Sequence, residues 1–151
     1  MTTRFPEPDL DDLYRELILD HYRHPRNRGH LSEATAQAEG YNPLCGDEIE
    51  VEIRVGDGKI EAVSFQGRGC SISQASGSMM TDAVKGMSKP EALALLGAFT
   101  KMMTDPEQEP KADLGDLEAF QGVAKFPVRV KCATLAWHVL EEGLEKESKD
   151  D

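Results

Sequence analysis

Two runs of alternating apolar and polar residues, joined by a short turn, constrain the fold of this chain most. Residues 48–55 are EIEVEIRV, with an apolar side chain at every second position, and IEAVSFQ follows at residues 60–66. The GDG between them, at 56–58, is typical of a tight turn. The pattern therefore predicts an antiparallel hairpin with one buried and one solvated face. In the second run, one face is expected to carry Ile60, Ala62 and Ser64 and the other Val63 and Phe65.

Apolar residues at helical spacing surround this hairpin. They predict an α+β fold, in which a small antiparallel sheet of about three strands packs against several helices. The third strand is expected at 34–42. Helices are expected at 8–24, from Ser71 with a Ser71–Gln74 capping box, from 88–91, at 116–122 in a short piece, and from Pro127 onward.

The remaining segments are polar. The acidic, proline-containing segment 104–118 is expected to be a loop, and the ends 1–7 and 146–151 to fray. No repeat or second apolar pattern divides the chain. We therefore expect one domain over residues 1–151.

Composition excludes several classes of function. The formal net charge of −11 argues against a nucleic-acid partner, because phosphate binding needs clustered Lys and Arg. No apolar run is long enough to span a membrane, and no signal peptide is visible. We expect a cytoplasmic protein. Three cysteines without a secretion signal favour metal-binding or catalytic thiols over disulfides.

The predicted hairpin brings two of these cysteines together. Cys45 and Asp47 lie where the first strand begins, and Cys70 lies just after the second strand ends. Because an antiparallel hairpin brings its two outer ends together, these residues are expected to be neighbours. Cys132 shares a face of the last helix with Leu135, and it joins the others if that helix starts at the same edge of the sheet.

Three thiols and one carboxylate form a tetrahedral donor set suited to Zn²⁺. Other interpretations stay open at this point. Cys132 is alternatively a small core residue, Asp47 a turn or cap residue, and Cys70 incidental to a glycine-rich turn. His21 and His24, spaced i, i+3 on the first helix, are a rival metal pair but are more typical of a solvated surface. His138 is expected to be structural.

Four motifs in order resemble a known family: ILDHYRHPRNRG, NPLCGDEIEV, GRGCSISQASGSMMT and VRVKCATLAWHVL. They are similar to the IscU/SufU (NifU N-terminal-like) family of iron–sulfur cluster assembly, over about residues 12–144. Two features resemble the zinc-dependent sulfurtransferase branch, SufU, more than the scaffold branch. Lys131 stands where scaffold members carry a histidine, and the 62 positions from Cys70 to Cys132 make a longer segment.

The resemblance implies that Cys45, Asp47, Cys70 and Cys132 bind Zn²⁺. It further implies that Cys45 accepts persulfide sulfur from a SufS-type cysteine desulfurase and passes it to downstream acceptor proteins. Asp47 and Arg129 are then expected to assist at the reacting thiol.

These residues are compatible with three functions. The first is a zinc-dependent sulfurtransferase for iron–sulfur cluster assembly. The second is a scaffold that builds a [2Fe–2S] cluster on the same thiols, binding iron, and delivers it to apo-proteins. The third is a non-enzymatic binding module with structural zinc.

Overall fold

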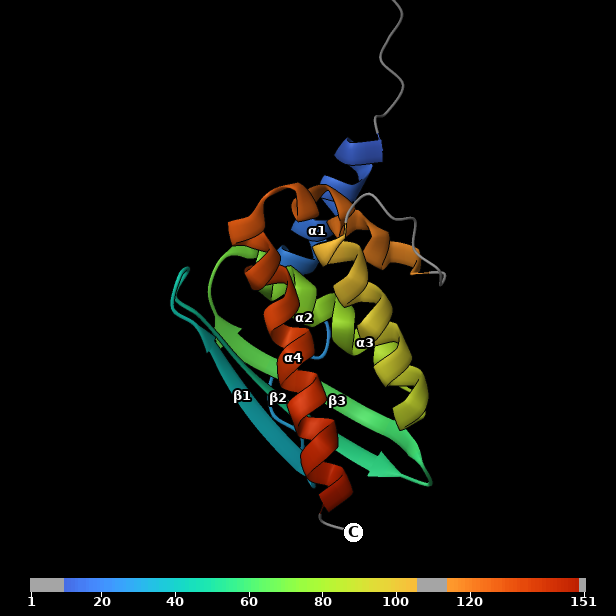
Figure 1. Cartoon of the computed structure of the whole chain (residues 1–151). Helices are drawn as coiled ribbons and strands as arrows, with labels where there is room; N and C mark the ends of the chain where they lie inside the picture. The colour runs from blue at the N-terminus through green and yellow to red at the C-terminus, as the bar shows by residue number, and fades with distance from the viewer. Residues whose placement is uncertain (1–9, 106–113, 150–151) are drawn as a thin grey trace, which may run out of the picture.

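The computed structural model of the chain describes residues 10–105 and 114–149. In chain order its elements are α1 (Leu10–Arg23), β1 (Ala36–Asn42), β2 (Asp47–Gly56), β3 (Lys59–Arg68), α2 (Ser71–Val84), α3 (Lys89–Thr104), the 3₁₀ helix η1 (Gly115–Lys125) and α4 (Pro127–Lys149) (Figure 1). The predicted α+β class is confirmed. Segment 1–7 and residues 106–113 of the predicted loop lie outside the described residues.

The three strands form one antiparallel sheet in the order β1-β2-β3, so the predicted hairpin and the third strand are confirmed. β2 and β3 are joined by Asp57 and Gly58, whose φ angles of 53° and 76° are those of a two-residue turn that matches the twist of the strands. On β2, Ile49, Val51 and Ile53 are buried as expected.

One side chain of β3 faces the other way from the prediction. Ile60 is fully buried in the same hydrophobic cluster as Val63 and Phe65. The register shifts between Arg54 and Val55, which pair with Ala62 and Ile60. The residue between Ile60 and Ala62 has no partner in β2. This extra residue in β3 breaks the alternation, so Ile60 faces the core.

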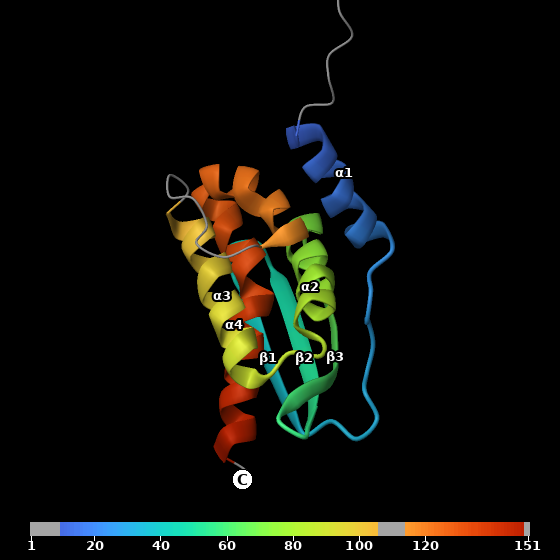
Figure 2. The same ribbon diagram turned by 90° about the vertical axis from the view of Figure 1, so that its right-hand side faces the viewer.

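The outer face of the sheet is less solvated than predicted. Glu52 and Ser64, which pair across β2 and β3, are only 8% and 4% exposed. The segment between α1 and β1 runs beside β3, where Arg28 forms a parallel bridge with Phe65, and then reaches β1 at the opposite edge (Figure 2). This segment covers part of the outer face.

The helices differ from the prediction at their ends. The N-cap of α2 is Cys70 and makes no side-chain cap hydrogen bond, so the predicted Ser71–Gln74 capping box is wrong. A capping box does form one helix later, where Ser88 and Glu91 bond reciprocally at the start of α3.

The predicted loop 104–118 is shorter, because Thr104 belongs to α3 and the short helix begins at Gly115. α4 starts at Pro127 as expected, and it extends to Lys149, into the segment 146–151 that was expected to fray.

The core lies between the inner face of the sheet and the helices. α4 crosses β1 and β2, while α2 lies along β3 (Figures 1 and 2). Trp137 of α4 is fully buried and stacks on Phe99 of α3, with ring centroids 4.7 Å apart. This packing places the first turns of α2 and α4 at the same end of the sheet as the β1–β2 loop (Figure 1). In the described part of the chain, none of the helices is long and apolar enough to cross a membrane.

Candidate metal centre

The three cysteines and Asp47 come from different elements that meet at this end of the sheet. Cys45 lies in the loop between β1 and β2, and Asp47 is the first residue of β2. Cys70 caps α2, and Cys132 lies in the second turn of α4. The hairpin predicted that Cys45 and Asp47 would lie beside Cys70, and the structure places them so. The sequence left the position of Cys132 conditional on where the last helix starts, and α4 does start at this end of the sheet.

The thiols of Cys45 and Cys132 are in direct contact. Their Sγ atoms are 2.9 Å apart, and all three cysteines are free. Cys132 is fully buried, whereas Cys45 is half-buried. The Sγ atoms of these two residues and a carboxylate oxygen of Asp47 all lie within 4.8 Å of one another. These three side chains form the tight part of the site.

Asp47 connects the tight part of the site to Cys70. Its carboxylate is fully buried, and Oδ1 accepts a hydrogen bond of 2.9 Å from the backbone N–H of Cys70. The other oxygen, Oδ2, is buried and has no hydrogen-bond partner among the described residues. A buried carboxylate oxygen without a partner is costly and therefore rare. Its position beside two thiols is that of an unused ligand.

Cys70 stands at the open side of the site. It is half-buried and lines a cavity of about 830 Å³ together with Phe126, at the end of η1, and Arg129, in the first turn of α4. Cys70 lies outside the group of three whose ligand atoms are all within 4.8 Å, although its side chain contacts Cys132. The structure therefore brings all four predicted residues together, with Cys70 more loosely placed than the other three.

The electrostatics of the site follow from burial and crowding. Burial raises the pKa of the Cys132 thiol far above its usual range, and contacts with Cys45, Asp47 and Cys70 raise it further. The pKa of the Arg129 guanidinium is also raised, first by the charge of Cys70 and next by contact with Cys132. Arg129 is exposed, but its charged end is directed at the thiols.

These residues fit a zinc ion. Three sulfur atoms and one carboxylate oxygen are the donors that Zn²⁺ binds in tetrahedral sites. The unpartnered Oδ2 of Asp47 supplies a ligand atom that otherwise has no role. Two glycines make room for this arrangement. Gly46 has a φ of +72°, and a Cβ on Gly69 would overlap Oδ1 of Asp47.

Sequence reasoning missed Asn42, the last residue of β1. It is buried, and its side-chain amide lies 3.8 Å from the Sγ atom of Cys132. Its Oδ1 accepts a hydrogen bond from the backbone N–H of Leu44, which shapes the loop that carries Cys45. Its position before a proline in the Cys45 loop was the available signal, because Asn commonly bonds to the backbone two residues on.

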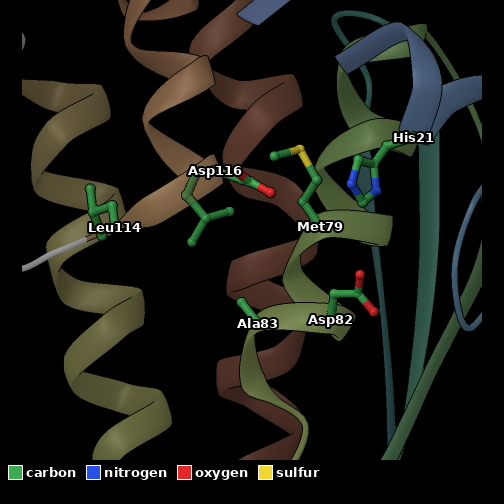
Figure 3. A pocket seen from close by; sticks show the side chains of 7 residues that line it. His21, Met79, Asp82, Ala83, Leu114 and Asp116 are labelled. Carbon is green, nitrogen blue, oxygen red and sulfur yellow. The ribbon is translucent and has the colours of Figure 1, made fainter. Parts of the chain in front are cut away.

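The histidines do not join this site. His21 is buried and its Nδ1 lies 2.7 Å from Oγ of Ser78, so the predicted surface position is wrong for His21, while His24 is exposed. His21 lines a small pocket with Met79, Asp82 and Asp116 (Figure 3). Burial lowers the pKa of His21, which favours the neutral imidazole. His138 is exposed on α4.

The fold and the site define a class: small α+β proteins that hold three cysteines and an aspartate at one end of a three-stranded sheet. Residues 13–146 match the family of the NifU-like N-terminal domain. The chain belongs to this family.

Two relatives and one solved structure illustrate the similarity. The chain is 48% identical to the zinc-dependent sulfurtransferase SufU of Bacillus subtilis over 92% of this chain and 94% of the relative. It is 45% identical to the iron–sulfur cluster assembly scaffold protein IscU of Streptococcus pyogenes, over 91% and 86% of the two chains. A crystal structure assigned as the SUF-system iron–sulfur cluster assembly scaffold protein of Fervidobacterium islandicum superposes with a TM-score of 0.80 at 35% identity. That superposition covers 85% of this chain and 94% of the other.

Proposed function

We propose that this protein is a zinc-dependent sulfurtransferase of iron–sulfur cluster assembly. In this proposal Cys45 accepts persulfide sulfur from a SufS-type cysteine desulfurase in the cytoplasm and passes it to downstream acceptor proteins. The observation that carries the proposal is the contact of Cys45 with Cys132 beside the unpartnered Oδ2 of Asp47. The similarity to a zinc-dependent sulfurtransferase supports it.

The placement of the three thiols favours Cys45 as the acceptor. Cys132 is fully buried in a helix, and Cys70 is fixed through its backbone N–H to Asp47. Cys45 lies in a four-residue loop between exposed Leu44 and exposed Gly46. A short loop at the surface can move its thiol toward a partner with little change in the core. Cys45 and Cys70 are equally half-buried, so it is the loop position of Cys45 that makes it the thiol best able to move toward a donor.

The transfer is a thiol exchange that balances without an oxidant. The Cys45 thiolate attacks the outer sulfur of the donor persulfide, R–S–SH. A new S–S bond forms to Cys45, the donor S–S bond breaks, and the donor leaves as the thiolate R–S⁻. The products are the Cys45 persulfide and the restored donor cysteine.

The acceptor must react as a thiolate, because the thiol is a poor nucleophile. Zn²⁺ held by Cys45, Asp47, Cys70 and Cys132 would supply this, since coordinated thiols lose their proton. Arg129 adds a second contribution from the chain itself. Its guanidinium faces the thiols and favours their charged form.

A turnover assay of a SufS-type desulfurase with and without the zinc-loaded protein tests the proposal. We expect strong stimulation by the wild type and none by Cys45→Ala. Mass spectrometry of the wild type should find one added sulfur atom on Cys45. Normal sulfur acceptance by Cys45→Ala would show that the acceptor is wrong, provided that circular dichroism shows the variant to be folded.

The scaffold function is the second candidate, because the chain is 45% identical to a scaffold protein. Thiolates also bind [2Fe–2S] clusters, so the same residues suit iron. Anaerobic reconstitution with iron and sulfide, followed by transfer to an apo-ferredoxin, separates the two functions. Cluster transfer without stimulation of the desulfurase would favour the scaffold.

A further inference from the structure

A second group of metal-ligating side chains lies on the outer face of the sheet. Nδ1 of His30, in the segment before β1, is 2.6 Å from Oε1 of Glu52 and 3.7 Å from Oε1 of Glu50. The ligand atoms of all three residues lie within 4.8 Å of one another. Glu50 and Glu52 are two positions apart on β2, so both point away from the core face that carries Ile49, Val51 and Ile53.

Two polar atoms beside this group are buried and without a hydrogen-bond partner among the described residues. One is Oε1 of Glu50, and the other is Oγ of Ser64. Ser64 is only 4% exposed and stands directly opposite Glu52 in the β2–β3 register. Directly opposed residues share a face with Cβ atoms about 5 Å apart, so the Ser64 hydroxyl faces the group. A buried hydroxyl and a buried carboxylate oxygen both left unpaired indicate a missing partner.

The charges of the group also require compensation. The Glu50 and Glu52 side chains are only 22% and 11% exposed. None of the described Lys or Arg side chains forms an ion pair with either of them. Among residues 10–105 and 114–149, His30 is the one basic partner of these two carboxylates, and it compensates one negative charge at most. Two neighbouring, largely buried carboxylates therefore share a single basic side chain, and a bound cation would balance the remaining negative charge.

The surrounding contacts hold Glu50 ready to bind a ligand. Its Oε2 accepts a hydrogen bond of 2.9 Å from the side-chain amide of Gln37 on β1, whereas Oε1 makes no hydrogen bond and lies 3.7 Å from Nδ1 of His30. A carboxylate oriented in this way by an outer partner is the usual arrangement around bound metals.

We propose that His30, Glu50 and Glu52 form a second divalent-cation site, separate from the thiol site. The donors are one imidazole nitrogen and two carboxylate oxygens, with the Ser64 hydroxyl placed to bond a metal-bound water. This mixed set suits a first-row divalent cation such as Zn²⁺ with an open position for water. The cation connects the segment before β1 to the centre of the sheet.

Zinc stoichiometry tests this site in the full chain. We expect the wild type to bind two Zn²⁺ ions per chain in equilibrium dialysis. His30→Gln and Glu52→Gln should each bind one, and Cys132→Ser should lose the other ion. The matched control Glu61→Gln removes one exposed negative charge from the same sheet and should keep both ions.

The His30 imidazole signals in NMR spectra provide the second readout. We expect them to shift with one equivalent of Zn²⁺ in Cys132→Ser, in which the thiol site is impaired. His30 itself is exposed, so the His30→Gln result stands even if Glu52→Gln does not fold. A second ion that persists in His30→Gln would be adventitious and would overturn the proposal. A wild type that binds one ion, lost in Cys132→Ser, would also overturn it.

Discussion

Asp47 is the residue whose chemistry distinguishes a metal site from a cluster of buried thiols. Its two oxygens have separate roles, since Oδ1 accepts the backbone N–H of Cys70 and Oδ2 has no partner among the described residues. A carboxylate that only capped α2 would have no reason to bury its second oxygen next to the thiols of Cys45 and Cys132. The two oxygens can be tested separately.

Asp47→Asn separates them, because the amide keeps an oxygen for Cys70 but replaces Oδ2 with an NH₂ group that does not bind zinc. We expect the zinc affinity to fall at least about tenfold, since even partners outside the ligand set cost 10- to 100-fold in metal sites. Competition with a chromophoric chelator measures the affinity. Asp57→Asn, in the exposed β2–β3 turn, is the control with the same charge change. An unchanged affinity in Asp47→Asn would remove Asp47 from the ligand set.

Arg129 acts on the thiols through its charge, so its removal should change the pH dependence of sulfur transfer. A nearby guanidinium favours the charged form of a thiol, so the loss of Arg129 should disfavour the thiolate. We expect the rate profile of Arg129→Gln to move to higher pH by up to about one unit, with zinc content unchanged. Lys131→Gln removes an exposed charge two residues further along α4 and is the control. Equal shifts in both variants would indicate a general effect of net charge.

At the scale of elements, periodicity predicted the helices and the β2–β3 hairpin, whose apolar side chains face one core, whereas β1 buries only Ala38 and Asn42 and has no clear apolar side. The errors occur where a local contact competes with the pattern. Ile60 follows a register shift that alternation does not reveal. The Ser71–Gln74 capping box is absent because the chain turns into α2 one residue earlier, at Cys70, whose backbone N–H is bonded to Asp47. The sequence did not predict the group of metal-ligating side chains on the outer face of the sheet, because His30 and Glu52 are far apart in sequence and their spacing matches no known metal motif.

A glycine allows close helix packing in α2, whereas a glycine in α3 has no such role. Gly77 of α2 faces β3, where an added Cβ would lie 2.9 Å from the Phe65 ring, whereas Gly97 of α3 has open space. We expect Gly77→Ala to destabilise the fold by about 1–3 kcal/mol through overpacking. Gly97→Ala should stabilise it by about 0.5–1 kcal/mol through its helix propensity. Urea denaturation measures both, and equal effects would show that α2 does not depend on this close approach.

At the scale of the molecule, the candidate metal centre joins parts that are far apart in sequence. Cys45 and Cys132 are brought into contact only because α4 crosses the sheet with its first turns at the β1–β2 loop (Figure 1). The hairpin alone predicted the proximity of Cys45 and Cys70, whereas the direction of α4 could not be deduced from its sequence. The hydrophobic cluster that contains Trp137 and Phe99 is built from apolar residues other than the candidate ligands, although Cys132 is fully buried on the same helix as Trp137. We therefore expect the fold to persist without zinc and to gain stability when zinc binds.

Zinc removal should lower the thermal stability of the whole chain without unfolding it at room temperature. A ligand at a thousand times its Kd stabilises the native state by about 4 kcal/mol. Burial raises the pKa of Cys132, so the metal-free thiol is protonated at neutral pH, and zinc binding must release this proton. The gain in Tm should therefore shrink as the pH falls from about 8 to about 6, where protons compete better for the thiols.

Thermal scans of zinc-loaded and chelated protein at both pH values measure this gain, and Cys132→Ser should lose most of it. A gain that grows as the pH falls would contradict thiolate ligation. Loss of the far-ultraviolet circular dichroism on chelation at room temperature would favour a purely structural zinc over a site with a thiol that leaves the metal. In that case Cys45 would be needed for folding itself, and Cys45→Ala should fail to fold instead of failing only to accept sulfur.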